Sequence, residues 1–245
     1  MKRFFMLSFF ALAVLGAETE AKTEKANSSP AEIKLKQEAA AAKVETAKTD
    51  PQIDKALLEL GAKIKDLRTF TADFTQLDID PLFMDESTHK GKLSFLRAVM
   101  EGKTNCFLRF DYTEPEKSVT ILAPLGVVIY TDDMTEPQIS PARDGNSADV
   151  IFSTFVSPAA LKRHYEVLPG KSQKPYSFRL VPKSAFAKSF FTEAEVDFSE
   201  KTGLPERLRQ IKINGQDITL NFSNAELNAQ LPVDNFDAAS LKKKP

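Results

Sequence analysis

Polar and apolar residues alternate through most of the chain beyond residue 69. Phe70, Ala72 and Phe74 alternate with Thr71 and Asp73. The same period of two recurs in four later stretches: residues 93–97, 176–180, 194–198 and 218–222. Such alternation is typical of antiparallel strands that bury one face. All stretches of this kind together predict roughly nine to eleven strands between residues 70 and 236.

A helical period comes before the strands and returns once between them. In residues 51–69 the apolar positions form one stripe, with Asp50 as the expected N-cap and Pro51 at the first helical position. The stripe consists of Ile53, Leu57, Leu60, Ile64 and Leu67. Residues 146–163 have a looser helical pattern that Pro158 interrupts, which favours two short helices. Asn214-Gly215 predicts a two-residue hairpin turn.

These elements predict a mainly β (α+β) fold class. A sheet of this many strands twists and curls instead of staying flat. Curled around its helices, it becomes an unclosed antiparallel β-barrel, or half-barrel. We expect the sheet to curl around the N-terminal helix and around a short helical insert formed by residues 146–163.

Both ends of the chain differ in composition from the predicted domain. Residues 1–17 place two basic side chains before a short apolar run that ends in small residues. This order is typical of a cleavable secretory signal peptide and predicts export into the periplasm. Residues 18–50 are rich in Ala, Lys and Glu without any aromatic residue, which predicts a low-complexity tether or mere filler. The folded domain is expected at residues 51–238, and residues 239–245 form a basic tail.

Charge, cysteine content and motifs narrow the possible functions. The chain has 33 basic and 34 acidic side chains, so no basic excess favours nucleic acid. Cys106 is the single cysteine; no disulfide can form within the chain, and a buried inert thiol is a better interpretation than a reactive one. His89 and His164 have no partner at metal-binding spacing, and catalytic motifs are missing. We therefore predict no enzyme, no cofactor and no metal.

The predicted buried face of the sheet contains many aromatic residues and one arginine. Composition alone does not separate a packed core from a cavity that a ligand opens. Arg97 shares this face with Leu93 and Phe95 by alternation. Its guanidinium carries five donors and no acceptor, and an unpaired buried charge is very costly. It therefore either donates to backbone carbonyls at the end of a covering helix or extends into water from a strand end.

Seven motifs follow one another along the predicted domain and lead to Phe236. They are FTADFTQ (70–76), GKLSFLR (91–97), LRFDYTEPEKSV (108–119), SPAALKRHYEV (157–167), RLVPK (179–183), VDFSEKTGLPERLRQ (196–210) and NGQDITLNFSNAELN (214–228). In this order and spacing they resemble the family of LolA-type outer-membrane lipoprotein carriers. The resemblance covers residues 52–237.

The resemblance implies a monomeric periplasmic carrier with an apolar cavity beneath a helical lid. Acylated lipoproteins would be received from an inner-membrane ABC-type lipoprotein-releasing complex and passed to an outer-membrane acceptor lipoprotein. GKLSFLR places the family's functional arginine at Arg97, as a latch that hydrogen-bonds the lid backbone. The implied lid residues are Val150, Ile151, Phe155 and Leu161. The implied cavity residues are Phe74, Leu93, Phe95, Phe110, Ile129, Phe178 and Phe222.

Three features depart from the family pattern. Ala98 stands where the family usually has Pro, residues 99–106 resemble an insertion, and VDNFDAASLKKKP replaces the usual Pro-Pro-x-Gly-Val tail. The last two departures concern partner choice and the direction of transfer more than the fold. The alternative function is an envelope sensor or regulatory protein of the same fold, which binds lipid or lipoprotein without transferring it.

Overall fold

The computed structural model describes residues 50–100, 102–124, 126–141, 157–183, 188 and 191–241. The helices are α3 (Pro51–Ile64), η1 (Pro158–Ala160), α5 (Leu161–His164), η2 (Val233–Phe236) and η3 (Ala238–Leu241). The strands are β1 (Thr69–Asp80), β2 (Asp85–Met100), β3 (Lys103–Glu114), β4 (Ser118–Ala123), β5 (Gly126–Thr131), β6 (Gln138–Pro141), β7 (Tyr165–Pro169), β8 (Ser177–Pro182), β9 (Phe191–Phe198), β10 (Pro205–Lys212) and β11 (Asp217–Leu227). The predicted signal peptide and all of the predicted tether except Asp50 lie outside the described residues.

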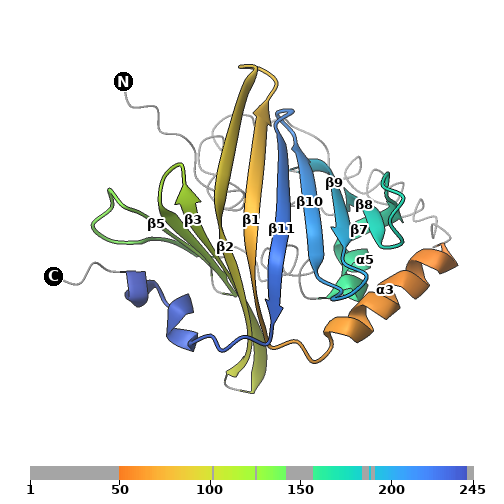
Figure 1. Cartoon of the computed structure of the whole chain (residues 1–245), viewed down its shortest axis with the longest axis horizontal. Coiled ribbons are helices and arrows are strands. Elements are labelled where there is room, and N and C mark those ends of the chain that lie inside the picture. Colours follow the sequence, from red (N-terminus) through yellow and green to blue (C-terminus); the bar gives the residue numbers. More distant parts are fainter. Residues whose placement is uncertain are drawn as a thin grey trace, which may run out of the picture.

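All eleven strands form one antiparallel sheet in the order β6-β5-β4-β3-β2-β1-β11-β10-β9-β8-β7. Its two edges, β6 and β7, are not paired with each other, so the sheet is unclosed. Figure 1 shows the curved sheet with α3 and α5 at one end and the long β1–β2 hairpin extending farthest at the other. The predicted fold class is therefore confirmed.

Helix α3 begins where the sequence predicts. The Asp50 side chain accepts a hydrogen bond from the backbone N–H of Gln52 at 2.9 Å, and Pro51 occupies the first turn, where its missing N–H costs nothing. The apolar stripe from Ile53 to Ile64 is buried against the sheet. Helix α3 ends at Ile64, earlier than the predicted 69, because Thr69 already pairs with Leu96 in the sheet.

The predicted β10–β11 turn differs in detail from the structure. The β10–β11 loop has three residues, not two, because the backbone N–H of Lys212 donates to the carbonyl of Gln216. Gly215 has a φ of 84°, which suits the left-handed last position of such a loop.

The predicted helical insert is described only in part. Pro158 begins η1, and α5 follows directly. Most of the predicted lid, residues 146–156, lies outside the described residues.

One face of the sheet packs against α3, and we call it the inner face. Its aromatic and aliphatic side chains form the main core together with the buried stripe of α3. Phe70 and Phe95 stack at 5.2 Å between ring centroids, and Phe74 meets Phe110 edge to face at 5.6 Å. Gly91 lies on this face between Phe74 and Tyr112 in the register, where a side chain would occupy the place of the Phe74 ring.

The opposite, outer face is covered in two different ways. Over β2–β5 it is apolar, and the C-terminal segment covers it: Phe236 and Leu241 are buried against Leu96, Ile121 and Val128. Arg109 fixes this segment by donating from Nη1 to the backbone carbonyl of Asn235 at 2.6 Å. Burial of Leu241 shows that packing contacts extend three residues beyond position 238, the predicted end of the domain.

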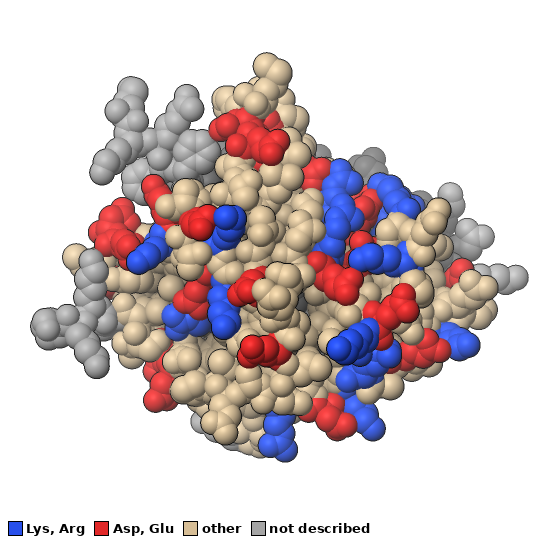
Figure 2. All heavy atoms as spheres, viewed as in Figure 1, with Lys and Arg blue, Asp and Glu red and all other residues tan. Residues whose placement is uncertain are grey.

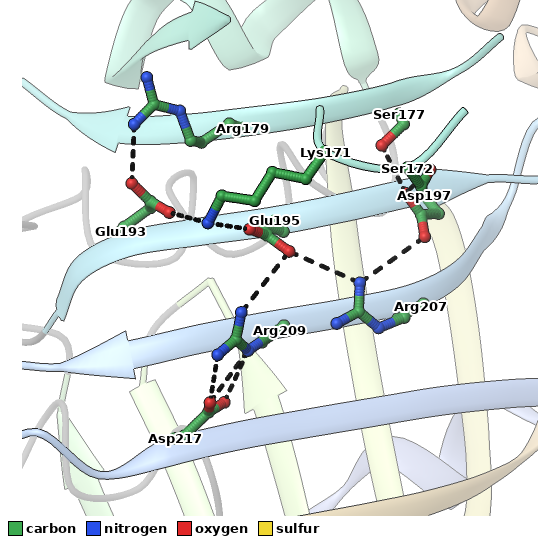
Figure 3. A network of polar contacts seen from close by, with 10 residues as sticks. All are labelled: Lys171, Ser172, Ser177, Arg179, Glu193, Glu195, Asp197, Arg207, Arg209 and Asp217. Carbon is green, nitrogen blue, oxygen red and sulfur yellow. Dashed lines mark hydrogen bonds and ion pairs between the residues drawn. The ribbon is translucent and has the colours of Figure 1, made fainter. Parts of the chain in front are cut away.

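Over β8–β11 the outer face instead carries an ion network (Figure 3). Glu195, nearly buried, lies between Lys171 at 2.7 Å, Arg207 at 3.6 Å and Arg209 at 3.8 Å. The remaining members are Ser172, Ser177, Arg179, Glu193, Asp197 and Asp217. Opposite charges on neighbouring strands stabilise the pairing. Figure 2 shows basic and acidic side chains interspersed over the viewed face, without a large area of one sign.

Gly91→Ala should destabilise the domain by about 1–3 kcal/mol, because the new Cβ would overlap the Asp111 carbonyl oxygen and approach Phe74 Cζ at 2.8 Å. Gly61→Ala on α3 is the matched control. Nothing lies within 4 Å of a Cβ at Gly61, so helix propensity should make this change neutral or stabilising by up to about 1 kcal/mol. Urea unfolding of both variants measures the difference. Equal effects of the two changes would contradict the close packing at Gly91.

Arg179→Met should weaken the ion network in a pH-dependent way. Burial opposes ionisation of Glu193, but hydrogen bonds from Arg179 and Lys171 outweigh it and lower the pKa of Glu193. A lowered pKa stabilises the fold above the ordinary glutamate pKa, and this contribution disappears as the pH falls through the lowered value. We expect a loss of about 0.5–1 kcal/mol at pH 7 that shrinks below about pH 4. Urea unfolding across pH measures it, with exposed Arg163→Met as the control expected to show no such dependence.

Candidate functional site

The seven residues predicted to line a cavity all lie on the inner face. Phe74, Leu93, Phe95, Phe110, Ile129 and Phe178 are 0–2% exposed, and Phe222 is partly buried against the same core. Their strands, β1, β2, β3, β5, β8 and β11, span most of the sheet. These side chains form an apolar layer over the part of the inner face that lies toward α3. Because these side chains are already buried, a ligand can reach them only if the segments that pack over them move.

The described cover consists of α3, η1 and α5. Leu161, the predicted lid residue at the start of α5, is 0% exposed and belongs to the main core. The other predicted lid residues, Val150, Ile151 and Phe155, lie outside the described residues. α3 lies beside the β9–β10 turn, where Gly203 has a φ of 74° and a Cβ would approach the side chain of Lys63 at 2.9 Å.

Polar contacts connect α3 to the rest of the domain at several points along its length. Near its start, Asp54 pairs with Lys162 of α5. In its middle, the Tyr176 hydroxyl donates to Glu59 at 2.9 Å, and this hydrogen bond raises the pKa of Tyr176. These groups are partly exposed, so each contact contributes little to stability. Polar contacts of this kind can break without leaving buried charges unpaired.

Arg97 provides the contact at the C-terminal end of α3. Its Nη1 donates to the backbone carbonyl of Lys65, the C-cap residue, at 3.2 Å. A cation at a helix C-terminus is favourable because the last carbonyls have no partner within the helix and carry partial negative charge. Of the two alternatives that the sequence leaves open, the structure therefore has the guanidinium at the end of a covering helix. The helix concerned is the N-terminal one; the latch on the predicted lid stays a prediction.

Polar groups on the inner face were missed by the sequence analysis. Thr120 is 1% exposed on β4, and its hydroxyl has no hydrogen-bond partner in the described part of the chain. Gln76 is also buried, and it accepts a hydrogen bond from Tyr112 at 2.9 Å. Alternation places these residues on the inner face, but polar side chains do not belong to a pattern of apolar positions.

The residues considered for other chemistry have ordinary surroundings. Cys106 is half-buried and packs against the edge of the main core, so it is less buried than expected. His89 lies within β2, 3.9 Å from Asp78. Among the described residues, no cluster of His, Cys, Asp and Glu is suited to hold a metal ion. No described helix is long and apolar enough to cross a membrane.

The sequence comparisons decide the family. Residues 65–239 match the family described as outer membrane lipoprotein carrier protein LolA. The chain belongs to the LolA family. A curated relative, the outer-membrane lipoprotein carrier protein of Bordetella avium (strain 197N), is 25% identical over 186 residues, which cover 75% of this chain and 82% of the relative.

Solved structures with a similar fold diverge more from this LolA-family chain. A putative outer membrane lipoprotein-sorting protein domain from Vibrio parahaemolyticus has a TM-score of 0.44 at 13% identity, covering 78% of this chain and 98% of that domain. MucB of Pseudomonas aeruginosa, solved as a MucA/MucB complex, has a TM-score of 0.40 at 15% identity, covering 76% of this chain and 60% of that one.

Proposed function

We propose that this LolA-family protein carries the acyl chains of lipoproteins through the periplasm, from the inner to the outer membrane. The observation that carries the proposal is the apolar layer on the inner face, which lies beneath helices that core packing and a few polar contacts hold in place. The action needs no catalytic group, because it consists of binding and release.

The energetics of acyl burial explain why such a cover is needed. Burying one methylene group contributes about 0.8 kcal/mol, so a chain of about sixteen carbons could gain on the order of 10 kcal/mol. A carrier that kept this whole gain would not release its cargo. Moving α3 and the lid off the inner face consumes part of it, since core contacts and the Arg97–Lys65 hydrogen bond are lost. Binding then stays weak enough for transfer to an acceptor.

The expected partners follow from this action. We propose that a monomer receives acylated lipoproteins from an inner-membrane ABC-type releasing complex and delivers them to an outer-membrane acceptor lipoprotein. The signal-like residues 1–17 would direct export, and residues 18–50 would serve as a tether.

A release assay tests the carrier function. Spheroplasts whose lipoproteins carry radioactive palmitate are incubated with the purified protein, and the soluble fraction is measured. We expect labelled lipoproteins in that fraction, bound to the protein. Protein isolated from the periplasm should also yield acyl lipids by mass spectrometry. Co-purified lipid without any release would favour the sensor or regulatory alternative, and absence of both would contradict acyl binding altogether.

Arg97→Leu tests the role of the helix-end contact. Removing a hydrogen bond from a charged, half-buried group should make the cover easier to open, so affinity for a fluorescent acyl probe should rise about fivefold to tenfold. Lys92→Leu is the matched control: it removes one positive charge from the exposed face of the same strand and should leave affinity unchanged. Identical probe binding by Arg97→Leu and wild type would show that Arg97 does not hold the carrier closed.

A further inference from the structure

The inner face is not apolar along its whole length. Toward the β1–β2 and β10–β11 turns, its positions are occupied by polar residues from four strands. Asp78 follows Phe74 and Gln76 on β1, and Lys212 follows Leu208 and Gln210 on β10. The register confirms the shared face: Asp78 and Gln210 both pair with buried Ile218 of β11. The inner face therefore changes from apolar near α3 to polar at the hairpin end.

Most of these polar groups are bonded to one another. The Tyr112 hydroxyl donates to Gln76, whose amide donates to Asp78 Oδ1 at 2.8 Å. His89 Nε2 lies 3.9 Å from Asp78 Oδ2 and 3.3 Å from the Ser87 hydroxyl. The contacts with Gln76 and His89 hold the Asp78 carboxylate in place. All three side chains are at least partly buried.

Lys212 is not part of this hydrogen-bonded group of side chains. It is half-buried on the inner face and lies opposite Phe191, which belongs to the main core. Within the described residues its ammonium makes no hydrogen bond and no ion pair, although Asp78 is close enough to attract it electrostatically. Burial lowers the pKa of Lys212 and raises the pKa of Asp78. A half-buried ammonium loses part of its hydration, so an acceptor that approaches it gains a favourable contact.

We propose that Lys212 marks the head-group end of the acyl-binding face and binds an oxyanion, the carboxylate or phosphate of an acyl lipid. Such a lipid would be a second kind of ligand, because the acyl chains of lipoproteins end in ester and amide groups that carry no oxyanion. The proposal rests on the proposed function, because it requires acyl chains on the inner face. A bound oxyanion would supply the acceptors that Lys212 lacks, through charge-assisted hydrogen bonds. The acyl chain would extend from Lys212 over Leu208 and Phe178 toward α3. This orientation matches the polarity of the ligand to the polarity of the face.

Two fluorescent probes of equal chain length test the proposal. Parinaric acid has a carboxylate head, whereas its methyl ester has the same chain and no charge. We expect the full-length wild-type protein to bind the acid about tenfold more tightly than the ester. Lys212→Met should bring this ratio close to one by weakening the acid alone. Lys201→Met, an exposed lysine in the β9–β10 turn, is the matched control and should keep the wild-type ratio.

Further measurements separate the possible outcomes. Lys212→Arg keeps the charge and should keep most of the preference, and thermal unfolding shows that each variant is folded. Competition with lysophosphatidic acid against a monoacylglycerol of the same chain length distinguishes a phosphate head from a carboxylate head. Equal wild-type affinities for acid and ester, or an unchanged ratio in folded Lys212→Met, would overturn the head-group site while leaving acyl binding intact. If neither probe binds, the proposed function fails as well.

Discussion

One constraint governs this domain: an open sheet of eleven strands has two faces, and each needs a cover. The inner face carries the larger apolar cluster, and α3 and α5 pack over part of it. Neither helix belongs to the sheet, and polar contacts such as Asp54–Lys162 and Arg97–Lys65 connect them to their surroundings. Because the helices and not the strands close this face, the sheet can keep its hydrogen bonds while the cover moves. A binding face can open without unfolding of the sheet only if its cover is formed by segments outside the sheet.

The outer face has contacts of its own that do not depend on the cover of the inner face. Over β2–β5 the C-terminal segment forms a second, smaller apolar cluster around Phe236 and Leu241. Over β8–β11 the ion network connects four strands from Arg179 to Asp217 (Figure 3). Neither the apolar cluster nor the ion network includes residues of α3, so in the proposed carrier both can persist when α3 moves. The C-terminal segment differs in sequence from the usual family tail, yet it has a structural role, because Phe236 and Leu241 cover the outer face.

Charge on the inner face is placed toward its two ends. Arg97 contacts the end of α3, and Lys212 lies near Asp78 at the hairpin end. Between them lie Phe74, Phe95 and the rest of the main core, where an unpaired charge would be prohibitively costly. In the proposed carrier, one end controls access and the other receives the polar part of the ligand. The apolar middle provides most of the binding free energy.

Local and periodic features were determined by the sequence itself. Alternation assigned Phe74 and Phe178 to the inner face, and the stripe and cap of α3 were visible because helix and strand periods depend only on nearby residues. Only the tertiary structure decided contacts between distant segments: Arg97 with Lys65, Phe236 with the outer face, and Lys212 near Asp78. These depend on strand order and on the curvature of the sheet. Many side chains together determine the strand order and the curvature, so no short stretch of sequence specifies these distant contacts.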